Sequence, residues 1–264
     1  MAKNYISVSG ISTLEELSEI GTFCSHERFG FPVVIGYQVS SESINQGTQN
    51  PRQPAFKHIG KLIDLTLNCG LMPAFHYYTK DNSTILPDLE KVLEATDAEG
   101  ALIQLNTLPP NQKTLEGIEK LGFQTIFKVA VSDKSSGGYA VWKGEEVQDS
   151  DLGDVASVVG QVRNTKHFLD YIMFDPSHGT NKGLNLSEES LAVRFGQEIS
   201  KIFPHLGLVY AGGIGPENVG ETIKTLAIYF PQGFSVDTES RVRTKDILDV
   251  GLVIEYLTNA QKAL

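Results

Sequence analysis

A glycine-rich segment, AGGIGPEN (211–218), directly follows the apolar run LGLVY. Glycines allow backbone N–H groups to approach an anion closely, and Pro216 with Glu217 suits the first turn of a helix. The helix N-terminus would then present further N–H groups and its positive dipole end to the same anion. We therefore predict a phosphate-binding site that includes Gly212 and Gly213. The alternative is a tight turn that binds no ligand.

A second half of the predicted phosphate site is the segment VDTESR (236–241), which includes Asp237 and lies where the last apolar run, GFSVD, ends. Thr238 and Ser240 follow it, and their hydroxyl groups can hydrogen-bond phosphate oxygens. Arg241 and Arg243 would attract a phosphate group, whereas the carboxylate of Glu239 would repel it. A solvated run of charges is the alternative interpretation of this segment.

Asp175 ends the apolar run DYIMFD and is followed by PSHGTNKG (176–183). A partly desolvated carboxyl group holds its proton more tightly, so Asp175 is a candidate general acid. Gly179 and Lys182 in the following segment suggest a flap that closes over a ligand. The alternative for Asp175 is a cap for the amides of this loop. His178 is a candidate acid or base, and the alternative for it is a solvent-facing loop histidine.

Ser9 ends the first apolar run, YISVSG. A serine hydroxyl takes part in nucleophilic catalysis only when another group activates it, and no such group is near in the sequence. The alternative for Ser9 is a structural role in the segment that leads into a helix at residues 13–17.

Eight apolar runs bounded by turn residues supply the elements that would position these side chains, and helical spacing separates most of them. Strands that alternate with helices form parallel sheets, and eight such units are what a closed (β/α)8 barrel requires. A doubly wound open sheet is the alternative. After the last run, a helix is expected over 247–257. The eight runs are YISVSG, FPVVIGY, MPAFHYY, ALIQLN, FQTIFKVAV, YIMFD, LGLVYAGG and GFSVD.

The chain length of 264 residues suits one α/β barrel, because such barrels reach this size as a single domain. We therefore expect one domain over residues 1–264, with long loops at about 39–55 and 132–154. Both loops follow strands, and so would lie on the face that carries active sites in such barrels.

The charge and cysteine content of the chain exclude several classes of protein. A net charge of -10 disfavours nucleic acids and anionic membranes as partners, because the field of the protein repels both. Cys24 and Cys69 suggest neither a disulfide framework nor a zinc site, and we expect no metal and no other cofactor. The sequence has no leader-like segment and no long apolar stretch, so we expect a cytoplasmic protein with a small phosphorylated substrate, as a monomer or a homodimer.

Several of these segments resemble phosphoribosylanthranilate isomerase, a (β/α)8-barrel enzyme of tryptophan biosynthesis. The most specific match is YAGGIGPENV (210–219), which is similar to L-A-G-G-L-x-P-x-N-V of that family. The other matching segments, in chain order, are ISVSGISTL (6–14), Asn50-Pro51-Arg52, Gln104-Leu105-Asn106, Asp175 with Gly179 to Lys182, and SVDTESRV (235–242).

The resemblance implies an Amadori rearrangement, in which an acid opens the ribose ring and a base removes the C2′ proton. It identifies Asp175 as the acid, and Arg52 as the bidentate partner of the anthranilate carboxylate. By the same resemblance, Gln104, Asn106 and Lys182 would bind the substrate, and Gly179, Gly212, Gly213, Thr238 and Ser240 would bind its phosphate.

The chain departs from the family at the catalytic base, because Ser9 stands where the family has a cysteine. A thiol with an ordinary pKa of about 8.5 supplies thiolate, whereas a hydroxyl does not. Another group would then act as the base, with Asp133 or His76 as candidates, or the substrate has changed. Three hypotheses follow: an isomerase of the phosphoribosylanthranilate type, an enzyme on another sugar phosphate, and a non-catalytic protein that binds a phosphorylated ligand.

Overall fold

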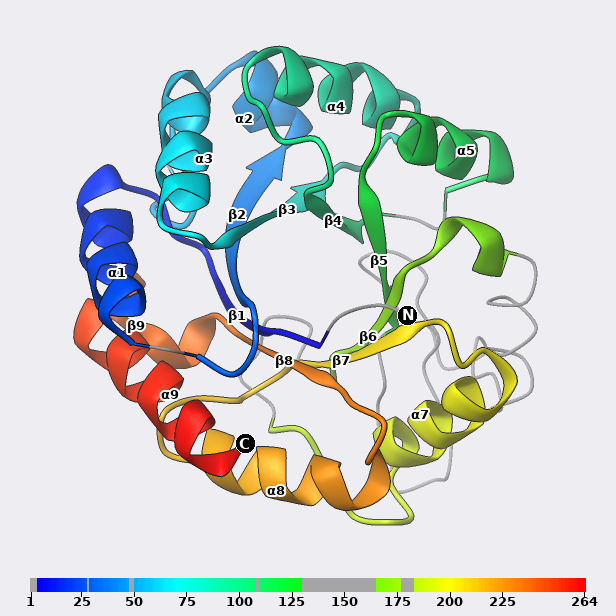
Figure 1. Cartoon of the computed structure of the whole chain (residues 1–264). Helices are drawn as coiled ribbons and strands as arrows, with labels where there is room; N and C mark the ends of the chain where they lie inside the picture. Colours follow the sequence, from blue (N-terminus) through cyan, green and yellow to red (C-terminus); the bar gives the residue numbers. More distant parts are fainter. Residues whose placement is uncertain (1–3, 28, 48–49, 108–109, 130–164, 177–182) are drawn as a thin grey trace.

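Eight parallel strands close into a barrel (Figure 1). The computed structural model of the chain describes residues 4–27, 29–47, 50–107, 110–129, 165–176 and 183–264. The strands are β1 (Ile6–Ser9), β2 (Val33–Ser40), β3 (Met72–Tyr78), β4 (Leu102–Asn106), β5 (Gln124–Val129), β6 (Tyr171–Phe174), β7 (Gly207–Tyr210) and β8 (Ser235–Thr238). Each strand pairs with the next along the chain, and β1 pairs with β8 to close the barrel.

All eight strands begin in the apolar runs from which they were predicted, and β2 and β8 continue beyond these runs to Ser40 and Thr238. The closed order from β1 to β8 confirms the (β/α)8 barrel and rules out the open-sheet alternative. The strands could be read from sequence because both faces of a parallel sheet are covered, and this requires near-continuous apolar runs.

Helices surround the barrel and cover the outer face of its strands, as the end-on view shows (Figure 1). Thr13 begins the first of them with a capping box, because its side chain accepts from the N–H of Glu16 while Glu16 reaches back to Thr13. The helices are α1 (Leu14–His26), α2 (Ser41–Asn45), α3 (Ile59–Asn68), α4 (Ile85–Glu94), α5 (Gln112–Lys120), α7 (Leu191–Ile202), α8 (Val219–Tyr229) and α9 (Val250–Ala263). Short 3-10 turns are η1 (Phe56–His58), η2 (Asn82–Thr84), η4 (Lys166–Phe168) and η5 (Ser240–Val242).

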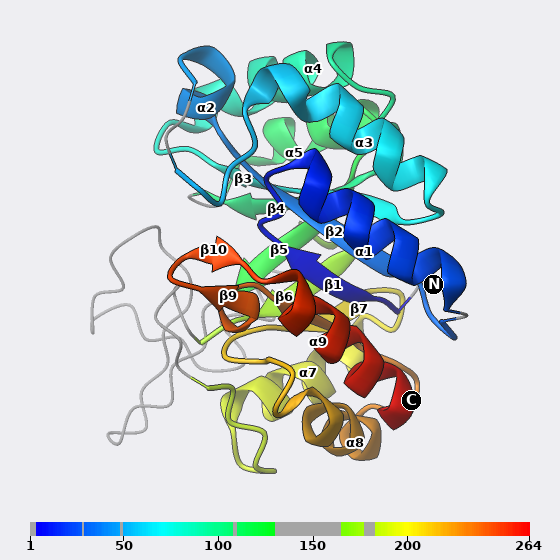
Figure 2. The same ribbon diagram turned by 90° about the vertical axis from the view of Figure 1, so that its left-hand side faces the viewer.

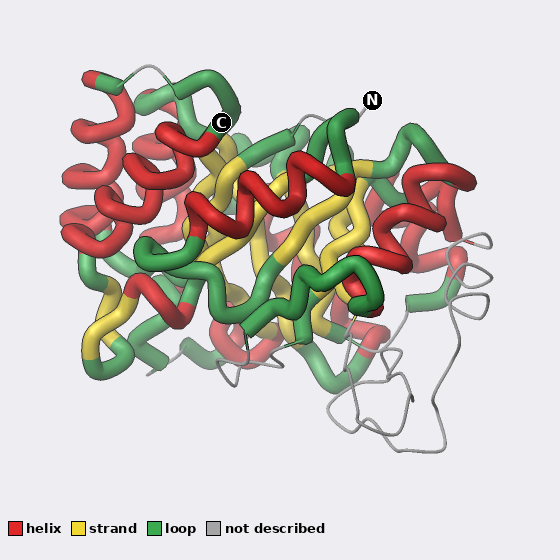
Figure 3. Tube along the Cα trace, turned by 90° about the horizontal axis from the view of Figure 1, so that it is seen from below, coloured by secondary structure: helices red, strands yellow, loops and turns green. Residues whose placement is uncertain are grey.

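The apolar core has two layers, which the alternation of side chains along each strand separates. In β4, Ile103 and Leu105 point outward and pack against the helices, whereas Leu102 packs inside the barrel. The inner layer is smaller and lies inside the closed barrel. Figure 3 shows the barrel from its side, with the strands in the middle and helices around them. Its buried members are Tyr5, Val34, Ala74, Leu102, Ile126, Tyr171, Met173, Val209 and Ala211.

A small hairpin replaces the first turn of the helix that was expected over 247–257. Strands β9 (Arg243–Thr244) and β10 (Ile247–Leu248) pair antiparallel, and Figure 2 shows them at one end of the barrel, next to the start of α9. The helix begins only at Val250, because the side chain of Asp249 caps it by accepting from the N–H of Leu252 at 3.2 Å. The apolar spacing from 247 therefore spans a strand and a helix.

The loops differ from the expectation in two further places. The segment 39–55 begins with the end of β2 and contains the short helix α2, so part of this expected loop is regular structure. Helix α8 begins at Val219, so Pro216 and Glu217 lie in a turn before the helix and not in its first turn. The loop expected at 132–154 lies outside the described residues. Within the described part of the chain, no helix is long and apolar enough to cross a membrane.

Candidate active site

Polar side chains occupy the barrel interior near the carboxyl ends of the strands. They alternate with outward apolar residues, as Ser7 and Ser9 do with Ile6 and Val8 in β1. Residues of this kind at the mouth of a (β/α)8 barrel are typical of a catalytic site. The inward polar residues at this end include Ser9 of β1, His76 of β3, Gln104 of β4, Lys128 of β5, Asp175 after β6 and Asp237 of β8.

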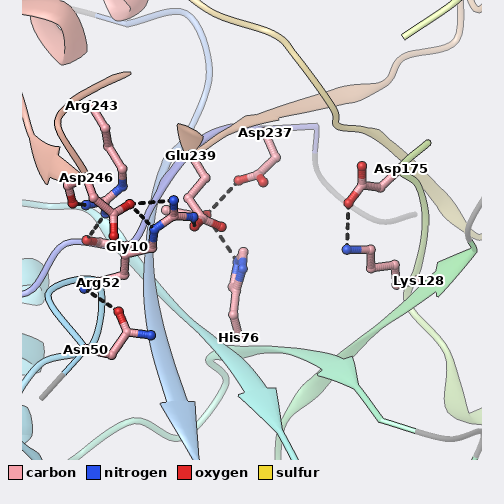
Figure 4. A network of polar contacts seen from close by, with 11 residues as sticks. Gly10, Asn50, Arg52, His76, Lys128, Asp175, Asp237, Glu239, Arg243 and Asp246 are labelled. Atoms are coloured by element: carbon pink, nitrogen blue, oxygen red, sulfur yellow. Dashed lines mark hydrogen bonds and ion pairs between the residues drawn. The ribbon is translucent and has the colours of Figure 1, made fainter. Parts of the chain in front are cut away.

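Lys128 and Asp175 form an ion pair at the barrel mouth (Figure 4). The Nζ of Lys128 lies 2.6 Å from Oδ2 of Asp175, and the two side chains are only 17% and 9% exposed. Because water screens this pair little, removal of one partner would leave the other charge uncompensated. The pair presents an ammonium donor and a carboxylate side by side.

Asp237 is a buried carboxyl group to which two serine hydroxyls donate. Ser7 and Ser9 both donate to its Oδ1, the latter at 2.7 Å. Burial raises the pKa of Asp237 to about 7, although the hydrogen bonds from Ser7 and Ser9 act in the opposite direction. A carboxyl group with a pKa near 7 can both take and give a proton under neutral conditions.

His76 lies on the other side of Ser9 from Asp237. Its Nε2 is 3.2 Å from the Ser9 hydroxyl, and burial lowers its pKa to about 4, so the ring is neutral at pH 7. Gly36 of β2 leaves room for this contact. A Cβ atom at Gly36 would lie 2.4 Å from Oγ of Ser9 and 3.0 Å from Nε2 of His76.

The glycine-rich segment after β7 packs against Asp175. Gly212 and Gly213 have φ angles of +101° and +65°, a region that L side chains rarely adopt. A Cβ atom at Gly212 would also lie 2.9 Å from Cδ of Pro176 and 3.0 Å from Oδ1 of Asp175. Glycine at position 212 therefore brings the backbone of this loop directly beside the carboxylate.

Asn218 and Thr238 hold the glycine-rich loop in place. The side chain of Asn218 accepts from the N–H of Gly215 at 2.8 Å and donates to the carbonyl of Gly213 at 2.9 Å. The hydroxyl of Thr238 donates to the carbonyl of Ile214 at 2.6 Å. Thr238 thus shapes the predicted phosphate loop, and its hydroxyl proton is already used by the protein.

Arg52 is engaged by two carboxylates from the segment after β8. Its Nη1 lies 2.7 Å from Oε1 of Glu239, and its Nε donates to Oδ1 of Asp246 at 2.7 Å. Arg243 belongs to the same segment and donates to the carbonyl of Asp246 and to the carbonyl of Gly10, which follows β1. Figure 4 shows this arginine cluster on one side of the site and the Lys128–Asp175 pair on the other.

One pocket joins these groups at the end of the barrel. Its lining brings together three acidic side chains, two basic side chains and the backbone of both predicted phosphate segments. The lining residues are Arg52, Lys128, Asp175, Ala211, Gly212, Gly213, Ile214, Asp237, Thr238, Glu239 and Ser240.

The residues predicted from sequence divide into three groups. Asp175, Arg52, Gly212, Gly213, Thr238 and Ser240 line the pocket. Ser9 and Gln104 are buried beneath it, and Gln104 donates to the side chain of Asn106 at 3.0 Å. Gly179 and Lys182 lie outside the described residues, as do His178 and Asp133, so their predicted roles stay predictions.

Sequence reasoning missed Lys128 and the position of Asp237. Lys128 sits within the apolar run FQTIFKVAV, where its inward direction follows from the alternation of Phe127 and Val129 toward the helices. This period-2 signal was available. No local pattern indicates the contact of Asp237 with Ser9, because it joins residues 228 positions apart and arises only when β8 pairs with β1.

Comparisons with known proteins support the fold. A phosphoribosylanthranilate isomerase from Pyrococcus furiosus superposes with a TM-score of 0.59 at 17% identity, covering 98% of this chain and 99% of that one. An N-acetylneuraminic acid synthetase from Leptospira borgpetersenii gives 0.56 at 11% identity, covering 100% and 84%. A 4-hydroxy-2-oxoglutarate aldolase gives 0.53 at 13% identity, covering 98% and 94%. At these identities the likeness concerns the barrel and not the reaction.

The sequence matches no protein-family model and no curated protein. The three structural neighbours have different names and share the barrel. A function for this chain therefore has to be argued from the side chains at the barrel mouth.

Proposed function

We propose that this protein is an isomerase that moves a proton between neighbouring carbon atoms of a small phosphorylated sugar. One observation carries the proposal: Asp237, a carboxyl group with a pKa near 7, lines the same pocket as the Lys128–Asp175 pair and the Gly212–Gly213 backbone. An aldose–ketose isomerisation needs a group that takes and returns a proton, a donor for the carbonyl oxygen, and an anchor for the rest of the substrate.

The anchor in this proposal is the loop after β7 with the start of η5. The backbone at Gly212 and Gly213 and the hydroxyl of Ser240 line the pocket and can donate to phosphate oxygens. The ammonium group of Lys128 adds positive charge to the same pocket. The carboxylate of Glu239 also lines it, but it pairs with Arg52 at 2.7 Å, which offsets its repulsion of an anion.

The proton transfer in this proposal uses Asp237 as the base. Its carboxylate removes the C2 proton of the open-chain aldose, while the Lys128 ammonium donates a hydrogen bond to the C1 oxygen and stabilises the charge that develops there. Asp237 then returns this proton to C1 while the proton of the C2 hydroxyl passes to the C1 oxygen, so that C2 becomes the carbonyl carbon of the ketose. The Lys128–Asp175 pair lies where it can serve the ring opening that precedes this step.

Arg52 limits the class of substrate in this proposal. The family resemblance gives Arg52 the role of binding an anthranilate carboxylate, but its Nη1 and Nε already donate to Glu239 and Asp246. An internal carboxylate therefore occupies the place of a substrate carboxylate. This arrangement favours a sugar phosphate without an acidic aglycone over phosphoribosylanthranilate.

Phosphoribosylanthranilate isomerisation is the second candidate. It is supported by the sequence resemblance at Asp175 and the glycine-rich loop, which the fold brings into one pocket. For this reaction, Arg52 would have to exchange Glu239 for the carboxylate of the substrate.

A proton-exchange assay tests the proposal on several candidate substrates in parallel. Purified protein is incubated in D2O with phosphoribosylanthranilate and with a panel of pentose and hexose phosphates, and loss of the C2–H signal is followed by proton NMR. We expect exchange and ketose formation with a sugar phosphate, and neither with the Asp237→Asn variant. Absence of exchange with every compound, despite phosphate binding, would support a non-catalytic ligand-binding protein instead.

A further inference from the structure

A chain of three buried polar side chains crosses the barrel from β8 to β3. Ser9 lies at its centre, with its Oγ 2.7 Å from Oδ1 of Asp237 and 3.2 Å from Nε2 of His76. Ser9 is fully buried and does not line the pocket, so it does not contact a ligand there. Its effect on any reaction in the pocket must therefore pass through Asp237.

The hydroxyl of Ser9 has one proton and two neighbours, which restricts the arrangements that satisfy all three groups. If Asp237 is ionised, Ser9 donates to it, and Nε2 of His76 must carry a proton and donate to Ser9. If Asp237 is protonated, it donates to Ser9, and Ser9 donates to an unprotonated Nε2. Ser7 tolerates both arrangements, because the carbonyl of Val236 at 3.4 Å is a second acceptor for its hydroxyl.

We propose that His76, Ser9 and Asp237 form a proton relay, in which Ser9 is the positioning residue that passes protons between the imidazole and the carboxyl group. One proton enters the imidazole at Nδ1, the Nε2 proton moves to Oγ of Ser9, and the Ser9 proton moves to Oδ1 of Asp237. One proton is gained by the unit and no bond between heavier atoms changes. The reverse sequence discharges Asp237.

Two features of the surroundings support the relay. The first is Gly36, which leaves the space between Ser9 and His76 that any larger residue would fill. The second is that burial favours the uncharged forms of both end groups, because it raises the pKa of the Asp237 carboxyl group and lowers the pKa of the His76 imidazole. The charged groups that act on Asp237 are Glu239 and Asp175, and those that act on His76 are Glu239, Lys128 and Asp175.

The catalytic role of the relay rests on the proposed function, because it supplies the base of that reaction. The relay itself is a property of the free protein, so NMR without substrate tests it independently. The carboxyl carbon of Asp237 and the ring nitrogens of His76 are followed across pH 5–9, with assignments from Asp237→Asn and His76→Gln. In the wild type we expect the His76 nitrogens to change tautomer with the same midpoint as Asp237, near pH 7.

Two matched variants separate a relay from a simple hydrogen bond. Ser7→Ala and Ser9→Ala each remove one donor to the same oxygen of Asp237, and each is expected to raise its midpoint by about one pH unit. Only Ser9→Ala should abolish the response of His76 at that midpoint.

Two outcomes would overturn the relay: wild-type His76 signals that do not follow the Asp237 midpoint, or identical His76 behaviour in the two serine variants. The first outcome decides the question even if Ser9→Ala fails to fold. A relay seen by NMR in a protein that exchanges no sugar-phosphate proton would leave the relay standing and reject the proposed reaction.

Discussion

The two ends of the barrel interior are built from the same strands but from opposite kinds of residue. Near the amino ends of the strands, the inward positions hold apolar side chains such as Val34, Leu102 and Ile126. Near the carboxyl ends, the inward positions hold polar side chains such as Ser9 of β1, Lys128 of β5 and Asp237 of β8. The change occurs within two residues along a strand, as between Ile126 and Lys128 in β5.

This difference shows how one barrel separates stability from chemistry. The apolar end gains free energy from burial and close packing, which a polar group would reduce. The polar end buries the carboxyl group of Asp237, which raises its pKa, and charges act strongly in such surroundings because water screens them little. Substitutions at the two ends should therefore differ in what they affect.

The largest effect is expected from Asp237→Asn at the polar end. Loss of a general base lowers turnover by about 10²- to 10⁴-fold, which kcat measured on the best sugar phosphate would show. Ser235→Ala is the matched control, because Ser235 is buried on the same strand and accepts from the N–H of Tyr5 at 3.0 Å, away from the carboxyl group. Similar turnover in Asp237→Asn and Ser235→Ala would remove Asp237 from the reaction.

At the apolar end, Leu102→Ala should lower the free energy of unfolding by about 2–5 kcal/mol, because it leaves a cavity inside the barrel. Urea denaturation measures this change. The specific activity of the folded variant should stay close to that of the wild type. A variant with wild-type stability but without activity would contradict the claim that the apolar end contributes to stability and not to the reaction.

A pH-dependent gain in stability is expected from Asp237→Asn. The folded pKa of Asp237, about 7, lies above its ordinary value of 3.8, so the stability linked to its protonated form is complete below pH 3.8 and is lost as pH rises through 7. Asparagine does not titrate. The free energy of unfolding of the variant, relative to that of the wild type, should therefore rise by about 2–3 kcal/mol when the pH is raised from 5 to 8. Denaturation at the two pH values measures this, and an equal difference at both would show that Asp237 is not buried as described.

His76 should act in the opposite direction. Its folded pKa, about 4, lies below the ordinary value of 6.5, so the stability linked to its neutral form is present above pH 6.5 and is lost as pH falls through 4. Because Asp237→Asn and the wild type share His76, this contribution cancels when the two are compared.

The smallest effect is expected at Arg52. Glu239→Ala removes one of its two carboxylate partners, so affinity for phosphoribosylanthranilate should rise about fivefold to tenfold, a modest gain because the pair is partly exposed. Fluorescence titration measures this change, and Glu239→Gln separates the loss of charge from the loss of size. An unchanged or lower affinity would mean that Arg52 is not free to bind a substrate carboxylate.

The fold and about half of the site could be predicted from sequence. Apolar runs, turn residues and the glycine-rich segment are local signals, so the eight strands, Asp175 and the Gly212–Gly213 loop were found. The partners of Ser9 and Arg52 were not, because Asp237 and Glu239 reach them only through closure of the barrel. The N-cap residue Asp249, after which α9 begins, is also a local signal, but the prediction followed the apolar spacing and placed the start of the helix at 247.

A crystal structure of the protein with D-ribose 5-phosphate tests the central claim most directly. The account predicts the phosphate group against the backbone of Gly212 and Gly213, with C1 and C2 of the sugar between Lys128 and Asp237. A phosphate group bound away from this loop, or a pocket that remains without the sugar at saturating concentration, would contradict it.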